Sequence, residues 1–301
     1  MRTLFTRRNV TIALIFVVLG VGVFAFVSLY KEVPKTSREP IESETAKKER
    51  KVIGKSVEGR EIEAYTYLPR GKAGGKGETH LMFVGGIHGG YEWNSILLAY
   101  TFIDYLETNP EVIPDNLFVT VIPSANPDGL YAVIQEEGRF TVADVPESGS
   151  TGLGRFNAHD VDLNRNFDCK WQPESTWREN VVSAGSSPFS EPETQAIRDF
   201  VLEHDPDVVV FWHSQANAVY PAECGGDILP ETRDIMQAYA RAANYQALES
   251  FDAYEVTGAA DGWFASIGIP ALTVELKTHE KIEWEQNLAG INALFEYYAK
   301  E

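Results

Sequence analysis

The sequence predicts an α/β domain with a mostly parallel, mixed central sheet covered by helices on both faces. Short apolar runs, typical of buried strands, alternate with longer stretches of helical spacing, which is the pattern of a doubly covered parallel sheet. Three of the apolar runs lead into side chains that can do chemistry, namely His88, His213 and Glu275. Because ligands of open α/β sheets gather beyond the carboxyl ends of the strands, we expect a functional site at that edge.

The first half of the domain shows strand, turn and helix signals in alternation. Polarity alternates along the opening strand, and the next two strands are almost entirely apolar. Clusters of glycine and proline mark the turns. In chain order we expect a strand over 59–68, a turn over 70–77, a strand over 80–84, a helix over 91–105, a strand over 117–122 and a turn over 123–129.

The second half begins with a long irregular stretch, whose length is typical of functional loops. A helix then opens with Ser190 as a capping residue and with Pro192 and Glu193 in its first turn. Its apolar side contains Ile197 and Phe200. In chain order we expect an irregular stretch over 136–188, this helix, a strand over 208–212, a helix over 228–248, a strand over 271–274 and a helix over 283–299.

Composition limits the classes of partner. The 301 residues have a formal net charge of −18 and a pI near 4.8. Nucleic acids and acidic membrane surfaces require clustered Lys and Arg, so neither is expected as the main partner. A cationic or neutral substrate fits this charge, although an acidic surface also keeps a protein soluble. The length predicts one folded domain, which we expect to be monomeric.

The N-terminus differs from the rest of the chain. Residues 1–9 form a basic segment with Arg2, Arg7 and Arg8, and residues 10–30 contain no charge and are almost wholly apolar. At about 1.5 Å per helical residue, this apolar segment is long enough to span a bilayer core. Its apolar stretch exceeds a usual signal-peptide core, so we expect an uncleaved transmembrane signal anchor.

Cleavage after residues 23–25 is the alternative, in which case the protein is secreted. Residues 31–50 are rich in Lys, Glu, Ser, Thr and Pro, which predicts a flexible linker. The folded domain is expected over 51–301, outside the cytoplasm, because long domains translocate largely regardless of flanking charge.

Cys169 and Cys224 are the two cysteines of the sequence. An even pair in an exported domain favours one disulfide, and two buried thiols are the alternative. Both cysteines follow segments that carry candidate site residues. A disulfide would therefore tie two active-site loops together.

The strongest local signal is the pair His88 and Glu92 at a strand-to-helix turn. The two side chains can converge on one metal ion, or Glu92 can merely complement the positive end of a helix. His213, at the end of another apolar run, completes a two-histidine and one-carboxylate set of the kind that binds catalytic zinc. Glu275 would then act as a general base close to the metal but not bound to it.

These residues resemble the zinc metallocarboxypeptidases of the carboxypeptidase A type. The resemblance covers about residue 51 to the C-terminus, and its motifs occur in the order that the family uses. The motifs are Ile53-Gly54-Lys55-Ser56-Val57-Glu58-Gly59-Arg60, His88 with Glu92, Asn126-Pro127-Asp128-Gly129, Val161-Asp162-Leu163-Asn164-Arg165-Asn166-Phe167, His213-Ser214 and Val274-Glu275-Leu276.

The resemblance implies roles for five further residues. Asn164 and Arg165 match the pair that holds the terminal carboxylate of the substrate, and Arg155 matches the arginine that polarises the scissile carbonyl. Tyr254 matches a mobile tyrosine that closes over the substrate. Asp261 matches the position that lines the side-chain pocket. An acid at this position resembles the arrangement in family members that prefer C-terminal Lys or Arg. Capping of a short helix is the alternative role for Asp261.

One spacing departs from the family pattern. The family usually has two residues between its first histidine and the glutamate, whereas three residues separate His88 from Glu92. Gly89 and Gly90 are two of the three, and glycine reaches backbone angles that are closed to other residues. We expect these glycines to absorb the extra residue.

The sequence thus predicts a zinc metallocarboxypeptidase with one Zn²⁺ per chain, which hydrolyses the C-terminal bond of peptides with a free carboxylate. Two alternatives remain. The first is a cell-envelope enzyme that cleaves peptidoglycan stem peptides, with Asp261 meeting the ammonium of a diamino acid. The second is a non-catalytic binding module that retains the carboxylate anchor.

Overall fold

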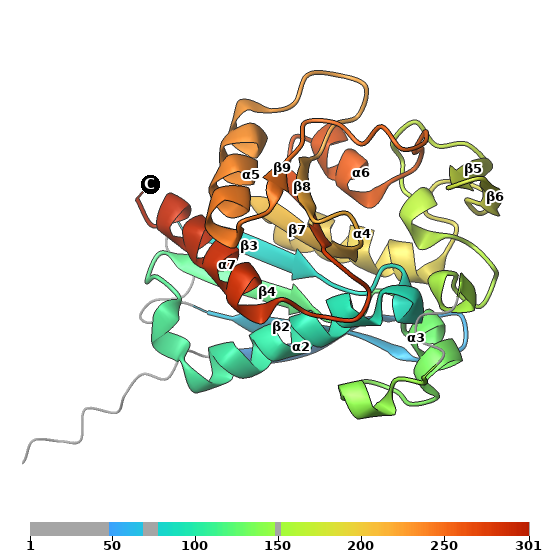
Figure 1. Ribbon diagram of the computed structural model, residues 1–301, viewed down its shortest axis with the longest axis horizontal. Coiled ribbons are helices and arrows are strands. Elements are labelled where there is room, and N and C mark those ends of the chain that lie inside the picture. Colours follow the sequence, from blue (N-terminus) through green and yellow to red (C-terminus); the bar gives the residue numbers. More distant parts are fainter. Residues whose placement is uncertain (1–47, 69–77, 148–151, 301) are drawn as a thin grey trace, which may run out of the picture. The chain divides into compact units, whose positions relative to one another are not determined.

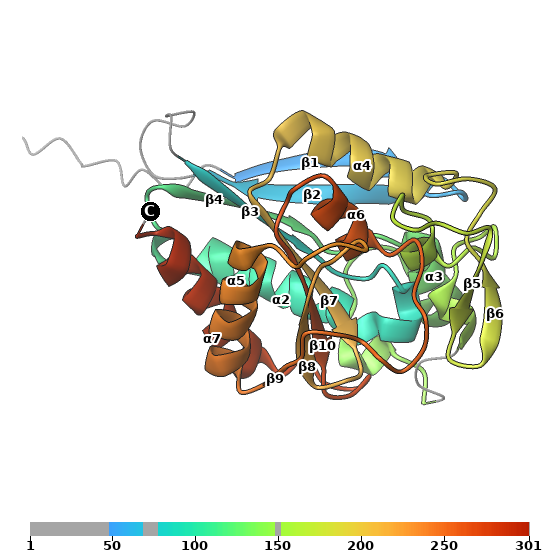
Figure 2. The ribbon, with the colours of Figure 1, turned by 90° about the horizontal axis from the view of Figure 1, so that it is seen from above.

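The computed structural model describes residues 48–68, 78–147 and 152–300. An eight-stranded mixed sheet runs through this part of the chain in the order β1-β2-β4-β3-β7-β10-β8-β9 (Figure 1). Helices α2, α5 and α7 cover one face of the sheet, and α4 and α6 cover the other (Figure 2). The predicted fold class is therefore confirmed.

The central strands are parallel and the outer ones are mainly antiparallel. β3 pairs in parallel with β4 and β7, and β7 pairs in parallel with β10. A separate two-stranded hairpin is formed by β5 and β6. The strands are β1 (Lys48–Lys55), β2 (Glu61–Tyr67), β3 (Thr79–Val84), β4 (Leu117–Ile122), β5 (Glu174–Trp177), β6 (Asn180–Ser183), β7 (Val208–Ser214), β8 (Ala218–Pro221), β9 (Gln246–Ala247) and β10 (Ala271–Leu276).

Proline occupies the first turn of α3, α4 and α5, where its missing N–H costs no helical hydrogen bond. The α-helices are α2 (Trp93–Thr108), α3 (Pro127–Ile134), α4 (Pro192–His204), α5 (Pro230–Ala243), α6 (Ala260–Ser266) and α7 (Trp284–Tyr298). Short 3₁₀ turns are η1 (Gly89–Glu92), η2 (Pro110–Val112), η3 (Val142–Asp144), η4 (Gly152–Arg155) and η5 (Leu163–Arg165).

Aromatic side chains fill the core on both faces of the sheet. On the α2 side, Phe83 stacks on Trp212 with ring centroids 5.3 Å apart, and Phe102 meets Phe83 edge-on at 5.2 Å. On the α6 side, Phe211 contacts Phe264 at 5.6 Å. Because β3 and β7 are packed on both faces, the ends of these strands are held in fixed positions. These ends carry the site.

Several elements differ from the predicted ones. Strand β1 begins at Lys48, inside the predicted linker, and β7 continues through Ser214, so that His213 belongs to the strand. The predicted turn over 123–129 is wrong in its second half, because Pro127 begins helix α3 and Asn126 caps it by accepting from the Gly129 N–H. The predicted irregular stretch contains the β5–β6 hairpin.

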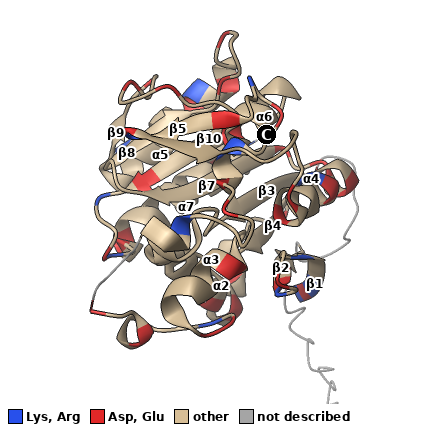
Figure 3. Cartoon of the chain, turned by 90° about the vertical axis from the view of Figure 1, so that its right-hand side faces the viewer, with Lys and Arg blue, Asp and Glu red and all other residues tan. Residues whose placement is uncertain are grey.

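The basic segment over 1–9, the anchor over 10–30, the linker up to residue 47 and the turn over 70–77 lie outside the described residues. None of the helices within the described ranges combines the length and the apolar character that a membrane span requires. Asp and Glu are spread over the described elements, with fewer Lys and Arg between them (Figure 3). The pattern agrees with the acidic composition.

One buried histidine of the sheet should make stability depend on pH. His80 is 1% exposed, and its Nε2 lies 2.8 Å from Thr120 Oγ1. Burial lowers the pKa of His80 to about 4. In the unfolded chain His80 becomes protonated below about pH 6.5, whereas in the folded chain it stays neutral down to about pH 4. The free energy of unfolding therefore decreases as the pH falls from about 6.5 to 4.

We expect the free energy of unfolding to fall by about 2 kcal/mol between pH 7 and pH 5 through His80 alone. Urea denaturation of the wild type and of His80→Gln at both pH values measures this contribution as the difference between their pH slopes. Equal slopes in the two proteins would contradict it.

Candidate metal centre and active site

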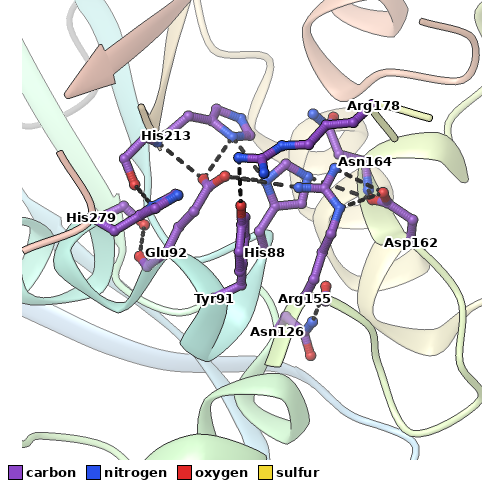
Figure 4. A network of polar contacts seen from close by, with 12 residues as sticks. His88, Tyr91, Glu92, Asn126, Arg155, Asp162, Asn164, Arg178, His213 and His279 are labelled. Atoms are coloured by element: carbon purple, nitrogen blue, oxygen red, sulfur yellow. Dashed lines mark hydrogen bonds and ion pairs between the residues drawn. The ribbon is translucent and has the colours of Figure 1, made fainter. Parts of the chain in front are cut away.

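Three buried side chains from separate elements converge at the carboxyl edge of the sheet (Figure 4). His88 follows β3 and precedes η1, Glu92 ends η1 at the start of α2, and His213 lies in β7. Their ligand atoms all lie within 4.8 Å of one another. This is the triad predicted from the sequence.

The nitrogen and oxygen atoms that could bind a metal face one another. His88 Nδ1 lies 2.8 Å from Glu92 Oε1, and His213 Nδ1 lies 3.1 Å from Glu92 Oε2. The two Nδ1 atoms are 3.2 Å apart. Two lone-pair nitrogens cannot form a hydrogen bond unless one is protonated, whereas both can donate to one cation. Two histidines and one carboxylate form a donor set that fits zinc.

The extra residue between His88 and Glu92 is absorbed by η1. Gly89 adopts a left-handed φ of +46°, and the 3₁₀ turn returns Glu92 to the side of His88. A Cβ at Gly89 would stand 2.6 Å from the carbonyl oxygen of Gly154, and one at Gly90 would stand 2.6 Å from Val133 Cβ. Gly89 therefore supplies the backbone freedom, and both glycines allow the close packing behind the metal site.

Asp162 organises the side chains behind the triad, a role that was not predicted. Its carboxylate accepts from Arg155 Nε at 2.8 Å, and its other oxygen lies 3.5 Å from His88 Nε2. Burial would raise the pKa of Asp162, but the guanidinium groups of Arg155 and Arg165 outweigh it and hold that pKa well below its usual range. A carboxylate on the far nitrogen of a histidine orients it as a metal ligand.

Glu275 lies beside the triad because of strand register. Residue 275 of β10 pairs with His213 of β7, so the carboxylate and the metal ligand are neighbours across the sheet. Glu275 Oε2 is buried and has no hydrogen-bond partner among the described residues. Burial, with a contribution from the Glu92 carboxylate, raises the pKa of Glu275 to about 7.

Arg155 and Arg165 are both buried and both line the same cleft, which has a volume of about 1110 Å³. Arg155 Nη1 is 3.9 Å from Glu92 Oε1, and its guanidinium lies 4.7 Å from the centre of the Trp177 ring. Arg165 donates to the carbonyl oxygens of Asn164 and Thr176. The cleft thus contains two fixed cations.

Asn164 is tied to helix α6. Its Oδ1 accepts from the Ala260 N–H at 2.9 Å, which leaves its amide nitrogen for the cleft. The same junction is closed by Gly258, whose N–H donates to the Cys169 carbonyl at 2.7 Å. A Cβ at Gly258 would stand 2.0 Å from the Arg165 carbonyl oxygen. The segments that carry Asn164 and Asp261 are therefore packed directly on each other.

Asp261 and Tyr254 also line the cleft. Asp261 is the second residue of α6 and accepts from Thr273 Oγ1 at 3.2 Å, whereas the N-cap of this helix is Ala259. Burial raises the pKa of Asp261. Tyr254 packs its ring against Phe251 at 4.9 Å. All the side chains predicted for the site thus reach one cleft.

The two cysteines form a disulfide, with a Cα–Cα distance of 5.8 Å. The bond joins the segment after Arg165 to the segment after β8, and both segments line the cleft. A Cβ at Gly262 would stand 2.8 Å from Cys169 Sγ, so the disulfide also packs against α6. A disulfide is typical of proteins that mature in an oxidising compartment.

Four further residues near the metal were not predicted as site residues. Tyr91 packs on His279 at 4.6 Å, and His279 Nδ1 lies 2.7 Å from Ser214 Oγ. Arg178 Nη2 donates to the Tyr91 hydroxyl at 3.2 Å. These contacts join segments that are far apart in the sequence, so local spacing does not predict them.

Comparison with known proteins agrees with this geometry. The family model for zinc carboxypeptidase matches residues 43–289. The chain is 25% identical over 225 residues to gamma-D-glutamyl-L-diamino acid endopeptidase 1 of Lysinibacillus sphaericus, covering 67% of this chain and 55% of that protein. It is 28% identical over 224 residues to carboxypeptidase B of Astacus astacus, covering 72% and 71%.

The fold is similar to that of the murein-tripeptide amidase MpaA from Escherichia coli O157. The two structures superpose with a TM-score of 0.58 at 22% sequence identity, over 81% of this chain and 91% of that one. The matched model covers most of the chain, and the His88, Glu92 and His213 donor set is intact. The chain therefore belongs to the zinc carboxypeptidase family and is a zinc-dependent hydrolase.

Proposed function

We propose that this protein removes a C-terminal residue with a cationic side chain from peptides. The observation that supports this proposal is the environment of Asp261. Its carboxylate faces the cleft and forms no ion pair among the described residues, and its Thr273 contact is a neutral hydroxyl. A half-buried acid without a cationic partner offers a place for an ammonium or guanidinium group.

The terminal carboxylate of the substrate would bind to Asn164 and Arg165. The Arg165 guanidinium is held by two carbonyl oxygens, and the Asn164 side chain is held by the start of α6. A planar guanidinium binds a carboxylate through two hydrogen bonds. Because this anchor is rigid, only the last peptide bond would lie beside the metal triad. Tyr254, on the segment before α6, would close over the bound residue.

His88, Glu92 and His213 would hold the zinc, which supplies Lewis acidity and a water with a pKa of about 7. Arg155 is held by Asp162 beside the triad, where its guanidinium would stabilise negative charge on the scissile carbonyl oxygen. Glu275 would accept the proton of the attacking water and donate it to the leaving amine. Its pKa of about 7 suits both transfers near neutral pH.

Replacing Asp261 by asparagine tests the pocket assignment. We expect the ratio of kcat/KM for a peptide ending in Lys to that for one ending in Leu to fall on the order of tenfold, because the amide keeps the volume but loses the charge. Peptides that differ only in their last residue measure the ratio. Asp252→Asn is the matched control, since Asp252 is exposed on the rim of the same cleft. An unchanged ratio in Asp261→Asn would contradict the proposal.

A second candidate function is hydrolysis of peptidoglycan stem peptides. It is supported by the printed names of two similar proteins, the diamino acid endopeptidase and the murein-tripeptide amidase. Asp261 would then pair with the ammonium of a diamino acid. Assays of Lys-ended and Arg-ended linear peptides against isolated stem peptides separate the two candidates. The intact donor set removes the reason for considering a non-catalytic binding module.

We also propose that residues 10–30 anchor the domain outside the cytoplasm, which the Cys169–Cys224 disulfide supports. Carbonate washing of membranes that contain the full chain tests the anchor. Retention in the membrane pellet is expected, and release into the wash would contradict it.

A further inference from the structure

The tip of the β5–β6 hairpin carries an arginine, Arg178, that lines the same cleft as the metal site. None of the roles described so far involves this cation. Arg178 lies between the two strands, with a left-handed φ of +57°. Its guanidinium donates to the Tyr91 hydroxyl at 3.2 Å (Figure 4). It also lies 5.7 Å from the centre of the Trp177 ring. The side chain is thus directed from the hairpin into the cleft.

Arg178 has no anionic partner within the described ranges, although the protein is strongly acidic. Arg60, Arg139 and Arg155 each pair with a carboxylate. Glu179 adjoins Arg178 and lines the same cleft, yet the two side chains form no ion pair in the described structure. A guanidinium that contacts only a neutral hydroxyl and an aromatic ring keeps most of its donors for a ligand.

The surface beneath Arg178 is rigid. Tyr91 is 7% exposed and packs edge-on against Trp177 at 5.1 Å. On its other side it contacts His279, which Ser214 holds by a hydrogen bond. The phenol hydroxyl is therefore a fixed acceptor, which lowers the entropic cost of holding a long arginine side chain in one place.

Arg178 and Asp261 contact different parts of the cleft wall. Asp261 contacts Thr273, two residues before Glu275 in β10. Arg178 contacts Tyr91, whose ring packs on His279, a residue that follows the end of β10. Along the chain, Glu275 thus lies between the contact of Asp261 and the residue on which the Tyr91–Arg178 pair packs. If the last residue of the substrate occupies the Asp261 pocket, the preceding residue extends past the triad towards Arg178.

We infer that Arg178, positioned by Tyr91, binds a carboxylate on the residue that precedes the scissile bond. This inference rests on the proposed function, because it takes the Asp261 pocket as the place of the last residue. The preferred substrate would then be dipolar, with an acidic penultimate residue and a cationic last one. Two sources supply that carboxylate: the side chain of an α-linked Glu, or the free α-carboxylate of a γ-linked Glu.

The test uses four N-acetylated tripeptides that all end in Lys. One pair has α-linked Glu or Gln in the penultimate position, and the other has γ-linked D-Glu or its α-amide. Each pair changes one charge and keeps the shape. For the wild type we expect kcat/KM to be about tenfold higher for the acid than for the amide in at least one pair, and the pair that responds identifies the source. The preference should decline with added salt, since Arg178 is exposed.

In Arg178→Gln the acid-to-amide ratio should fall to near one, whereas Arg178→Lys should retain part of it. Arg241→Gln is the matched control, because Arg241 is an exposed arginine in the last turn of α5 that forms no ion pair with any described residue and does not line the cleft. Tyr91→Phe should weaken the ratio through loss of positioning.

A wild type that cleaves all four peptides without preference would overturn the inference and leave the proposed function intact. No preference for Lys over Leu as the last residue would instead overturn the proposed function. An unchanged ratio in Arg178→Gln would also overturn the inference.

Discussion

Replacing Glu275 by glutamine should reduce kcat about 10³-fold while zinc remains bound, because the change removes the proton acceptor and none of the three metal donors. The amide keeps the shape of the side chain beside His213, which is fixed by the pairing of β10 with β7. Glutamine cannot accept a proton from the attacking water or return one to the leaving amine. The loss should therefore fall on kcat more than on KM.

The measurement combines steady-state kinetics with metal analysis of the purified variant. Glu280→Gln is the matched control, since Glu280 is an exposed acid shortly after the same strand. Stoichiometric zinc with negligible turnover in Glu275→Gln is the expected result. Turnover within a few-fold of the wild type would eliminate Glu275 as the general base.

Replacing Asp162 by asparagine should weaken zinc binding about 10- to 100-fold and lower kcat on the order of 10²-fold. Two losses are expected because one carboxylate supports two partners. It lies 3.5 Å from His88 Nε2, where it orients a metal ligand, and it accepts from Arg155 Nε and Nη2 at 2.8 Å. The variant removes the nearest counter-charge of the buried Arg155 and leaves Glu92, 3.9 Å away, as its remaining one; such a loss is costly.

Zinc affinity is measured by competition with a chromophoric chelator, and kcat is measured at saturating zinc, which separates the two effects. Asp168→Asn controls for loss of a charge in the same segment, because Asp168 is exposed. Circular dichroism of both variants reports folding. If Asp162→Asn kept both zinc affinity and kcat within twofold of the wild type, the supporting role would be refuted.

The sequence predicted the metal donors well because they lie at or just after the ends of two apolar strands, β3 and β7, whose signals are local. His213 and Glu275 come from separate strands, and the parallel pairing of those strands makes them neighbours. The extra residue between His88 and Glu92 could also be accommodated in the prediction, since a glycine-rich turn can return Glu92 to the side of His88. Local sequence patterns, each confined to one segment, were therefore sufficient to predict the metal triad and most strands of the sheet.

Other features depend on contacts between distant segments or on elements that are too short to show periodicity. Strand β9 has two residues, and β8 has four. Asn126 and Pro127 fit a turn and a helix start equally well, and the burial of Leu130 and Val133 decides for the helix. Arg178 and Tyr91 meet across 87 positions. Contacts between residues so far apart could not be predicted from the residues next to each of them in the chain.

The pairing of β7 with β10 fixes the reacting groups of the site, whereas the residues proposed to select the substrate lie outside the main sheet. His213 and Glu275 belong to adjacent strands whose spacing is set by backbone hydrogen bonds, so their separation does not depend on loop conformation. The groups that would choose a substrate, Asp261 and Arg178, lie on a short helix and a hairpin tip outside the main sheet. Mutation can therefore exchange one substrate for another through these outer segments while the spacing of His213 and Glu275 stays unchanged.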